Sequence, residues 1–538
     1  MKNNTKILDC TLRDGGYYNN WDFNKKTVEK YLVAVKKAKI DYIEIGFRNF
    51  AQNKFLGPYA YSTDKFIENL PNIDGLNLGV MSDASIFFNR GDSIENAVNE
   101  LYKPKSESPI SLVRIAAHYK DIARCEEIVK NLKGLGYIVG FNLMQTGGRK
   151  ESEIEDAVKL IDSWKCVDVL YFADSLGNMN DKDVIKTIKS IKTYWKNALG
   201  IHTHNNKGQA LSNSLTASIN GVSWLDSTVL GMGRGAGNAC TEDLLREINR
   251  EKNLNYLPEE VYDLVLDDFS AMQKKYNWGH SLLYSLGADY EIHPTYIQEM
   301  LSEKRYSNKD ILQMVKNMRD MPTRSFNKDT LDIIKNKTSN IDKGTWNANG
   351  WCKNREIVLI GNGPNSEAYR DGIVEYIKNY KPLVLSLNTQ KNYSDDIIDG
   401  YIAANKSRIV IESKFYEKIK KPIYAPKFLF VDLPNYKDIA NNIYDYGFSI
   451  NKDNLIISES NCQIPADLAA IYAFSLVTIG MAKKISLVGF DGYEKNDLRQ
   501  EEMQNAIAMY KKNEKAIDLV ALTPTSYQVA KSSIYAPK

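Results

Sequence analysis

Eight short apolar runs recur between residues 6 and 228 of this 538-residue chain, and helix-like segments separate them. Strands that alternate with helices form parallel sheets. Eight such units in about 250 residues match a closed (β/α)₈ TIM barrel in count and size. An open doubly wound sheet is the alternative, but eight consecutive units without a Gly-rich nucleotide turn favour the barrel. The runs lie at 6–10, 42–47, 76–81, 111–117, 137–143, 167–173, 199–204 and 222–228.

The carboxyl ends of these runs carry polar residues suited to catalysis. Active sites of (β/α)₈ barrels lie at this end of the strands, and three of the five histidines of the chain fall there. We therefore expect an active site at this end of the barrel. The two glycines of CTLRDGG should let the backbone turn sharply beside a ligand. The polar residues are Arg13, Asp14, Glu44, Arg48, His118, Asp174, His202 and His204.

The sequence His202-Thr203-His204 is a candidate pair of metal ligands. Residues two apart on a strand point to the same side, so both imidazoles can face the barrel mouth. Asp14 would add a carboxylate from the first run. Three such ligands with open coordination positions are typical of a catalytic metal site. A lone H-x-H is a weak signal, and the carboxylate at the end of the first strand strengthens it.

Three motifs in order resemble those of the DRE-TIM metallolyases, namely TLRDGG, HTHNN and GMGRGAGN at 231–238. This superfamily includes HMG-CoA lyase, isopropylmalate and homocitrate synthases, and 4-hydroxy-2-oxovalerate aldolase. The resemblance implies that Asp14, His202 and His204 bind a divalent metal, Mn²⁺ or Mg²⁺ with Zn²⁺ as the alternative. It also implies that Arg13 stabilises the enolate of a 2-oxo acid and that Asn238 lies at or near the metal.

The glycine-rich loop looks most like that of the aldolase branch. It lacks the cysteine that HMG-CoA lyase carries near the position of Gly231, and no feature indicates an acyl-coenzyme A site. The resemblance therefore implies a carbon–carbon lyase that cleaves or forms a 4-hydroxy-2-oxo acid through a pyruvate enolate. A Claisen-type acyltransferase is the alternative. A non-catalytic scaffold is a third interpretation. The complete set of candidate metal ligands argues against it.

Tyr17 departs from the aldolase pattern, which has a histidine three residues after the metal aspartate. A tyrosine has an ordinary pKa near 10 and is a poor base at neutral pH. His118 and His293 are therefore the other candidates for proton transfer. The altered loop also indicates a different aldehyde partner. The expected substrate-binding residues are Glu44, Arg48, Asp174 and Asn238.

The second half of the chain begins with a helical, polar pattern and ends with a new α/β pattern. We expect a barrel domain at 1–256, a helical extension at 257–343 and a Rossmann-like domain at 350–538, and the resemblance to barrel aldolases implies that the extension covers the barrel mouth. The stretch TSNIDKGTWNANGW, Thr338 to Trp351, predicts a linker. Strands are predicted in EIVLIG, LVLSLN, YIAAN, RIVIES, KFLFVDL, NLIIS and ISLVGF.

GNGPNS and the later GFDGY resemble segments of bacterial sialyltransferase-type and related surface-glycan proteins. The resemblance implies a site for a nucleotide or nucleotide sugar, and with it a role in surface-glycan biosynthesis as a further alternative. A G-x-G-P turn without the full G-x-G-x-x-G is a weak phosphate signal, and a tight turn without ligand is equally compatible. The residues expected at this site are Gly361, Asn362, Gly363, Asn388 and Asp491.

Composition excludes several other classes of protein. The net charge is +3 and lysines are scattered among acidic residues, which argues against nucleic-acid binding. Six cysteines without a C-x-x-C pair fit a reducing cytoplasm. The N-terminus lacks a signal-peptide pattern. The apolar stretch 468–482 is shorter than the roughly 20 residues of a membrane span and predicts a core helix. We expect a cytoplasmic homo-oligomer.

Overall fold

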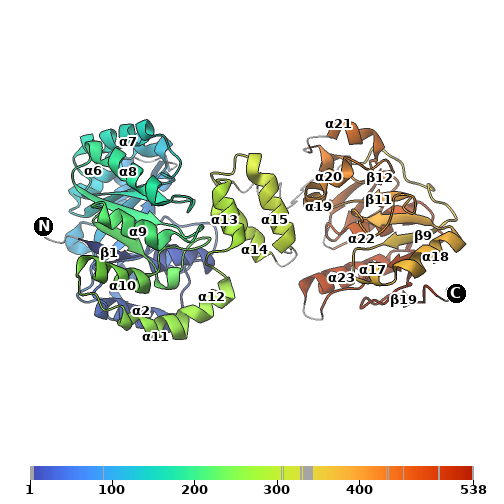
Figure 1. Ribbon diagram of the computed structural model, residues 1–538, viewed down its shortest axis with the longest axis horizontal. Helices are drawn as coiled ribbons and strands as arrows, with labels where there is room; N and C mark the ends of the chain where they lie inside the picture. The colour runs from blue at the N-terminus through green and yellow to red at the C-terminus, as the bar shows by residue number, and fades with distance from the viewer. Residues whose placement is uncertain are drawn as a thin grey trace. The chain divides into compact units, whose positions relative to one another are not determined.

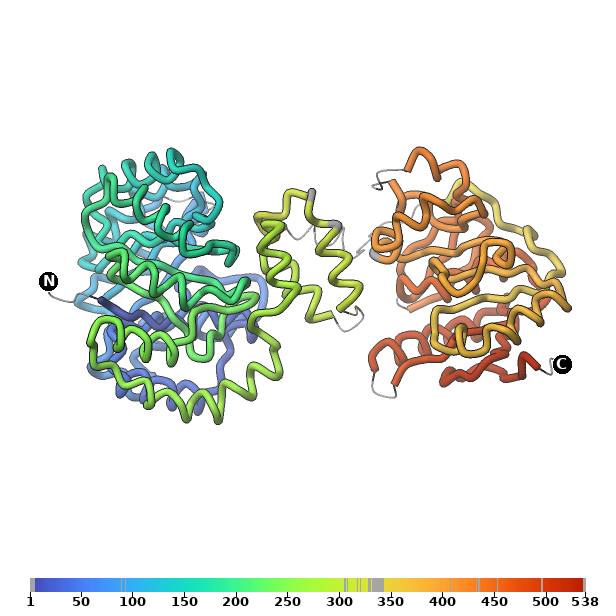
Figure 2. Tube along the Cα trace, in the orientation of Figure 1, coloured from blue at the N-terminus to red at the C-terminus, as the bar shows by residue number. Residues whose placement is uncertain are grey.

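The computed structural model describes residues 5–535 except 89, 92, 304, 305, 307, 328, 329, 331–342, 432, 434, 435, 452, 495 and 496. The chain divides into two compact units. The first comprises Met1–Met300 with Pro322–Ser325, and the second comprises Leu301–Met321 with Phe326–Lys538. Figure 2 traces the first unit in blue to green and most of the second in yellow to red.

The first unit contains a closed barrel of eight parallel strands. Each strand coincides with one of the eight predicted apolar runs, which confirms the barrel and not an open sheet. Helices follow the strands and surround them (Figure 1). The strands are β1 (Lys6–Asp9), β2 (Tyr42–Phe47), β3 (Leu78–Asp83), β4 (Ile110–Ala117), β5 (Ile138–Leu143), β6 (Val169–Asp174), β7 (Ala198–Thr203) and β8 (Trp224–Ser227). The main helices are α2 (Lys25–Lys37), α3 (Asp64–Glu68), α5 (Ile94–Leu101), α6 (Glu126–Gly134), α7 (Glu151–Trp164), α8 (Asp181–Tyr194), α9 (Ala210–Ile219) and α10 (Thr241–Lys252).

The barrel strands are apolar along most of their length because both of their faces are buried. One small cluster of buried residues includes Leu8, Leu112, Tyr171 and Trp224, contributed by four of the strands. The guanidinium of Arg114 lies 4.7 Å from the centre of the Tyr171 ring. This apolar cluster therefore adjoins the charged residues of the barrel.

The helical segment after the barrel contributes to the first unit. Helix α13 spans Leu282–Asp289 and α14 spans Pro294–Ser302. From α14, Gln298 accepts a hydrogen bond from Gly235 N at 3.0 Å and donates to Tyr17 O at 3.3 Å. Through these two hydrogen bonds, α14 connects the glycine-rich loop with the segment after β1. Helix α15 (Asn308–Asn317) is part of the second unit.

The second unit is a parallel α/β domain. Its main sheet has the order β13-β12-β11-β10-β9-β17-β18-β19, and a small sheet has the order β14-β16-β15. The long helices are α18 (Arg370–Tyr380), α22 (Ala469–Ile479) and α23 (Leu498–Lys512). The main-sheet strands are β9 (Glu356–Ile360), β10 (Leu383–Leu387), β11 (Gly400–Ile402), β12 (Ile423–Tyr424), β13 (Ile443–Tyr444), β17 (Lys484–Val488), β18 (Leu519–Ala521) and β19 (Ala530–Lys531). The small sheet contains β14 (Gly447–Ile450), β15 (Ile456–Ile457) and β16 (Asn461–Ile464).

Two of the strands predicted in this unit are helical. RIVIES falls largely in α19 (Lys406–Ile411), and KFLF forms a 3₁₀ turn at Lys427–Phe430. The side chain of Asn405 accepts a hydrogen bond from Arg408 N and caps α19, so a local cap overrides the β-branched composition. The apolar stretch near 468–482 forms the buried helix α22, as predicted. None of the described helices is long and apolar enough to cross a membrane.

The predicted linker is in part a packed segment of the second unit. Gly344 N donates to Ser460 O at 3.0 Å, and Trp346 N donates to Asp445 O at 3.0 Å. The Trp346 ring lies 5.5 Å from the Tyr424 ring. Residues 338–342 lie outside the described residues. The polar composition of this short segment predicted a free linker. It packs against the second unit because its tryptophan rings bury a large apolar area.

Candidate metal centre

Asp14, His202 and His204 converge at the carboxyl ends of the barrel strands. One ligand atom from each lies within 4.8 Å of the others, and all three residues are buried. Asp14 ends the short helix α1 (Thr11–Asp14), His202 lies in β7, and His204 follows that strand. The two imidazole rings are 5.1 Å apart, as the two-residue period of a strand requires for neighbours on one face.

The turn from β1 into α1 is built by its own polar and small residues. The Asp9 carboxylate accepts a hydrogen bond from Thr11 N at 2.9 Å and so starts the turn. Gly15 has an ordinary helical φ of −66°. At Gly16 a side chain is excluded because its Cβ would lie 2.0 Å from the Trp21 ring. The second glycine is therefore needed for packing, and not for the sharp turn expected from the sequence.

Asn238 completes the donor set from the glycine-rich loop. It forms an isolated β-bridge with His204, and its Nδ2 donates to Asp14 Oδ2 at 2.7 Å. Among the described residues, Asn238 Oδ1 and His204 Nδ1 are buried and have no hydrogen-bond partner. A Cβ at Gly233 would lie 2.4 Å from Asn238 Oδ1 and 2.7 Å from Asp14 Oδ2. Carboxylate, imidazole and amide groups are suitable ligands for a divalent cation, and the free atoms Asn238 Oδ1 and His204 Nδ1 leave room for one.

A second buried group, Cys10, His202 and Asp226, also lies within ligand distance. Its donors are less suited to a metal. Burial raises the pKa of the Cys10 thiol well above its ordinary value, which disfavours the thiolate that metals bind. His202 Nδ1 is already 2.9 Å from Asp226 Oδ2. The group containing Asp14 and both histidines is therefore the better candidate.

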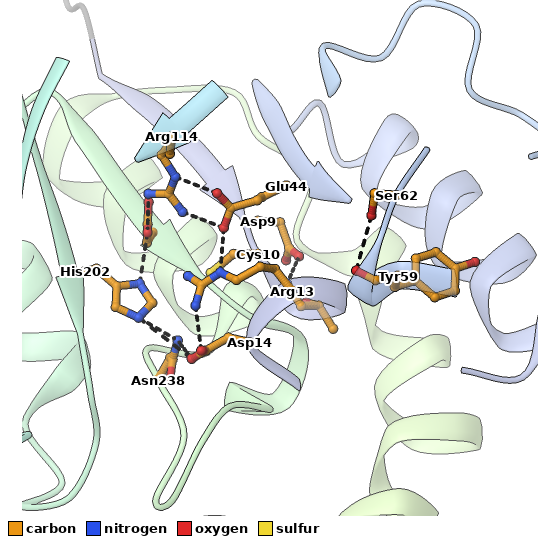
Figure 3. Close-up of polar contacts among 12 residues, drawn as sticks. Asp9, Cys10, Arg13, Asp14, Glu44, Tyr59, Ser62, Arg114, His202 and Asn238 are labelled. Carbon is orange, nitrogen blue, oxygen red and sulfur yellow. Dashed lines mark hydrogen bonds and ion pairs between the residues drawn. The ribbon is translucent and has the colours of Figure 1, made fainter. Parts of the chain in front are cut away.

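Arg13 bridges the carboxylate of Asp14 and a second buried acid, Glu44 (Figure 3). Its NH1 donates to Asp14 Oδ1 at 2.6 Å, and its Nε donates to Glu44 Oε2 at 2.7 Å. Glu44, which the sequence predicts at the substrate site, is fully buried and holds this arginine in place. Burial raises the pKa of Asp14, but Arg13 and the histidines lower it further, so the carboxylate stays ionised.

Arg114 links both sides of the centre. It donates to Glu44 through Nε and NH2, and to Asp226 Oδ2 through NH1, each at 2.7 Å. Asp226 in turn contacts His202. Two guanidinium groups thus face three carboxylates, those of Asp14, Glu44 and Asp226. These five groups together carry one net negative charge, and the positive charge of Arg234 also acts on Asp14.

The three acid–base candidates surround one cation of the glycine-rich loop, Arg234. Its guanidinium lies 5.2 Å from the Tyr17 ring, and its charge acts on Tyr17, His118 and His293. Burial raises the pKa of Tyr17 and lowers the pKa of both histidines, which keeps all three groups neutral. Burial also lowers the pKa of His204 to about 3, so its imidazole is neutral.

Arg48 and Asp174 have local partners. Arg48 NH2 donates to Ser62 O and to Asp64 Oδ1, both at 2.6 Å, and its guanidinium thereby ties together the segment after β2. The Asp174 carboxylate accepts a hydrogen bond from Asn178 N at 3.0 Å in the turn after β6. These contacts supply structural reasons for both residues.

Four residues that the sequence reasoning did not assign are important here: Arg114, Asp226, Arg234 and Gln298. The sequence could have indicated Arg114 and Asp226, because a charged residue inside an apolar strand needs a partner when it is buried. Arg234 was visible as the one charged residue in GMGRGAGN. Gln298 had no local signal, since only the tertiary fold brings α14 to the loop.

The five residues expected at a nucleotide site of the second unit all line one cleft of about 490 Å³. They come from three separate segments of the sequence, and the sheet brings them together. They are Gly361, Asn362, Gly363, Asn388 and Asp491.

Comparison with known proteins places this geometry in a family. Residues 4–265 match the family model described as HMGL-like. A 4-hydroxy-2-oxovalerate aldolase from Pelotomaculum thermopropionicum is 30% identical over 249 residues, which are 46% of this chain and 70% of the relative. The chain belongs to the HMGL-like family. Its barrel is thus an aldolase- and lyase-family domain, distantly related to 4-hydroxy-2-oxovalerate aldolases.

Two further comparisons agree with this HMGL-like assignment. A 4-hydroxy-2-oxovalerate aldolase from Geobacillus genomosp. 3 is 30% identical over 246 residues, 46% of this chain and 70% of the relative. A crystal structure from Bacteroides vulgatus, described as the N-terminal domain of a "putative aldolase", has a TM-score of 0.51 and 32% identity. That match covers 57% of this chain and 99% of the solved domain.

Proposed function

We propose that the barrel is a divalent-metal-dependent aldolase that cleaves or forms a 4-hydroxy-2-oxo acid through the enolate of pyruvate. One observation carries the proposal: the buried Asp14, His202 and His204 ligand set has an arginine, Arg13, hydrogen-bonded to its carboxylate. Kinship with 4-hydroxy-2-oxovalerate aldolases supports the reaction class.

The donor set defines what a metal would do in this site. A divalent cation held by Asp14, His202, His204 and Asn238 would act as a Lewis acid on the keto group of a 2-oxo acid. Arg13 would stabilise the negative charge that develops on the enolate oxygen, because its guanidinium is fixed beside Asp14 before the reaction begins. Glu44 holds this guanidinium in place and leaves it little freedom to reorient.

Arg234 is suited to bind the carboxylate of the 2-oxo acid. Its Nε atom is buried and, among the described residues, has no hydrogen-bond partner. A buried donor without a partner is costly. A carboxylate from the substrate would satisfy it and add a charge-assisted hydrogen bond.

The proton steps follow from the neutral state of the surrounding groups. During cleavage a base must take the proton of the 4-hydroxyl group as the C3–C4 bond breaks. His118 and His293 suit this role because burial lowers the pKa of each and leaves a ring nitrogen able to accept a proton. Tyr17, whose pKa is raised, would donate a hydrogen bond and not act as the base.

Deuterium exchange into pyruvate tests the proposal without knowledge of the aldehyde. The full chain, loaded with Mn²⁺ or Mg²⁺ in D₂O, should exchange the C3 protons of pyruvate without coenzyme A, as followed by proton NMR. A chelator should stop the exchange. Arg13→Lys should slow it by about 10²–10³-fold, because an ammonium cannot reproduce the planar guanidinium.

Two further assays separate aldolase from Claisen chemistry. Pyruvate release from a panel of 4-hydroxy-2-oxo acids would then identify the aldehyde half. Absence of exchange, or exchange that is indifferent to chelator, would overturn the proposal. Product formation that requires an acyl-coenzyme A would assign the barrel to the Claisen alternative.

A further inference from the structure

The cleft in the second unit lies at the carboxyl edge of its main sheet. It is lined by the segments that follow three neighbouring strands, β9, β10 and β17. From β9 the sheet grows through β10 to one side, and the chain later returns to place β17 on the other side. Open parallel sheets bind ligands at such a reversal of strand order. The volume of about 490 Å³ is that of a small-molecule site.

The backbone N–H groups of the glycine turn after β9 are not free to bind a phosphate. Gly361 N and Gly363 N donate to carbonyl groups at the end of β17, at 2.8 and 3.0 Å. Asn365 N donates to Asp491 Oδ2 at 2.7 Å. A carboxylate thus occupies the place beside the turn where a phosphate binds in dinucleotide folds. The glycines are needed because a Cβ at either would lie 2.6 Å from Gly489 O.

Hydrogen-bond acceptors dominate the polar lining of the cleft. Within the described part of the chain, Asn388 Oδ1 and Asp491 Oδ1 are buried and have no hydrogen-bond partner. Four carboxylates line the cleft against two guanidinium groups. Buried acceptors without partners, such as Asn388 Oδ1 and Asp491 Oδ1, favour a ligand that donates hydrogen bonds. The acidic residues are Asp310, Asp467, Asp491 and Glu502, and the basic ones are Arg408 and Arg499.

Two other properties narrow the ligand class. The described residues contain no group of metal-binding side chains in this cleft, since both groups of that kind lie in the barrel. Aromatic rings line the cleft as well, among them Phe490, Tyr493 and Tyr527. Tyr493 is 44% exposed, and the Arg499 guanidinium lies 4.2 Å from its ring centre, so a ligand ring can pack only on the face that the guanidinium leaves open.

We propose that this cleft binds a sugar ring through its adjacent hydroxyl groups, either the ribose of a nucleoside or the ring of a saccharide. Adjacent hydroxyls supply the donors that Asn388 and Asp491 lack, in the way that an acidic residue binds ribose in dinucleotide folds. Aromatic side chains cover the apolar face of such a ring. The site is separate from the barrel, so the proposal does not depend on the aldolase reaction.

Binding to the full chain tests the proposal with defined probes. The panel contains cytidine, uridine, adenosine and guanosine with their 5′-monophosphates, and glucose, galactose and N-acetylglucosamine. Saturation-transfer NMR detects binding and calorimetry gives affinities. We expect at least one probe to bind. The analogue of that probe without adjacent hydroxyl groups should bind at least tenfold more weakly. Inorganic phosphate should not compete with the probe for the cleft. Preference for nucleosides or for saccharides identifies the source of the ring.

A matched pair of variants tests whether the probe binds in the cleft. Asn388 has a φ of 57°, which glycine adopts freely, so Asn388→Gly removes the amide without backbone strain. Asn354 has a φ of 60° and is exposed outside the cleft, so Asn354→Gly is the control. We expect at least tenfold weaker binding for Asn388→Gly and no change for Asn354→Gly.

A second variant keeps the test decisive if the first does not fold. Asp491→Asn preserves an acceptor for Asn365 N and reduces the acceptor capacity of the cleft, so it should also weaken binding. The proposal is overturned if no probe binds the wild-type chain or if inorganic phosphate competes. Equal binding by the analogue without hydroxyls, or by the folded cleft variants, would also overturn it.

Discussion

Asp226 places its Oδ2 atom 2.9 Å from Nδ1 of His202, and Nε2 of the same ring then faces Asp14 at 3.7 Å. The fully buried carboxylate is itself fixed by Arg114. A carboxylate on the far nitrogen of a ligating histidine sets its tautomer, orients its ring and increases its basicity. Asp226 is therefore a positioning residue for the metal centre, although it contributes no ligand to the preferred set.

Replacing Asp226 should weaken metal binding without abolishing it. We expect Asp226→Asn to raise the Kd for Mn²⁺ by about 10–100-fold, the usual effect of losing such a partner. Calorimetric titration of the metal-free chain measures the Kd. Asp268→Asn is the matched control, because Asp268 pairs with an exposed lysine, Lys30, outside the site. Equal affinity of both variants for Mn²⁺ would contradict a positioning role.

Removal of a ligand should have a larger effect than removal of a positioning residue. We expect Asp14→Ala and His204→Ala to lose tightly bound divalent metal and pyruvate exchange while the chain stays folded. Elemental analysis of the purified proteins measures the metal, and circular dichroism measures the fold. His280→Ala, which changes an exposed histidine of the same unit, should keep its metal. Full metal content in both ligand variants would show that the site is elsewhere.

Asp174 should make the stability of the chain depend on pH. Burial raises the pKa of this carboxyl to about 7, against an ordinary value near 4. Nearby backbone N–H groups lower the pKa, and Asp183 raises it. The folded chain thus binds more protons here between about pH 4 and pH 7. This contribution to stability is complete at about pH 4 and below and is lost as the pH rises through 7.

The variant Asp174→Asn removes this titration. Its thermal midpoint relative to wild type should therefore be higher at pH 8 than at pH 5. Circular dichroism at the two pH values measures both midpoints. The same difference at pH 5 and pH 8 would mean that Asp174 is ionised over the whole range.

The barrel, and the convergence of Asp14, His202 and His204 at one end of it, could be predicted from the sequence because their signals are local. Each strand is a continuous apolar run, and the H-x-H spacing alone puts His202 and His204 on one face. Asp14 follows the first strand directly. The positions of these residues along their strands determine their end of the barrel, so no long-range information is needed.

The support of the site could not be predicted in the same way. Glu44 and Arg13 were separately visible, but only the closed barrel brings Glu44 of β2 between Arg13 and Arg114 of β4. In the second unit the β-branched run RIVIES indicated a strand, but it forms the helix α19, which Asn405 caps. Long-range pairing and local caps outweigh composition in these places.

The segment before residue 350 should stabilise the second unit. The Trp346 ring lies 5.5 Å from Tyr424 and 5.1 Å from Tyr444, and aromatic pairs contribute about 0.5–1.5 kcal/mol each. We expect the fragment 343–538 to unfold roughly 4–8 °C above the fragment 350–538. Thermal melts followed by circular dichroism measure the midpoints. Trp346→Ala in the longer fragment should remove most of the gain, and equal midpoints for the two fragments would show that the segment contributes nothing.

Arg234 should determine the affinity for the 2-oxo acid more than the rate of its enolisation. Its guanidinium lies over Tyr17 and its buried Nε atom has no hydrogen-bond partner among the described residues, whereas Arg13 is held against Asp14. A hydrogen bond to a charged group contributes about 1.5–3 kcal/mol. We therefore expect Arg234→Gln to raise the KM for pyruvate exchange by roughly 10–150-fold, with a much smaller change in kcat.

Arg13→Lys provides the contrast for this prediction, because it should lower kcat and leave KM nearly unchanged. Exchange rates over a range of pyruvate concentrations separate the two parameters. Metal content of Arg234→Gln, measured in parallel, excludes an indirect effect through the ligands. A KM for pyruvate equal to that of wild type would remove Arg234 from the pyruvate subsite. If cleavage of 4-hydroxy-2-oxo acids with a second acidic group were then impaired, the guanidinium would instead bind the aldehyde half of the substrate.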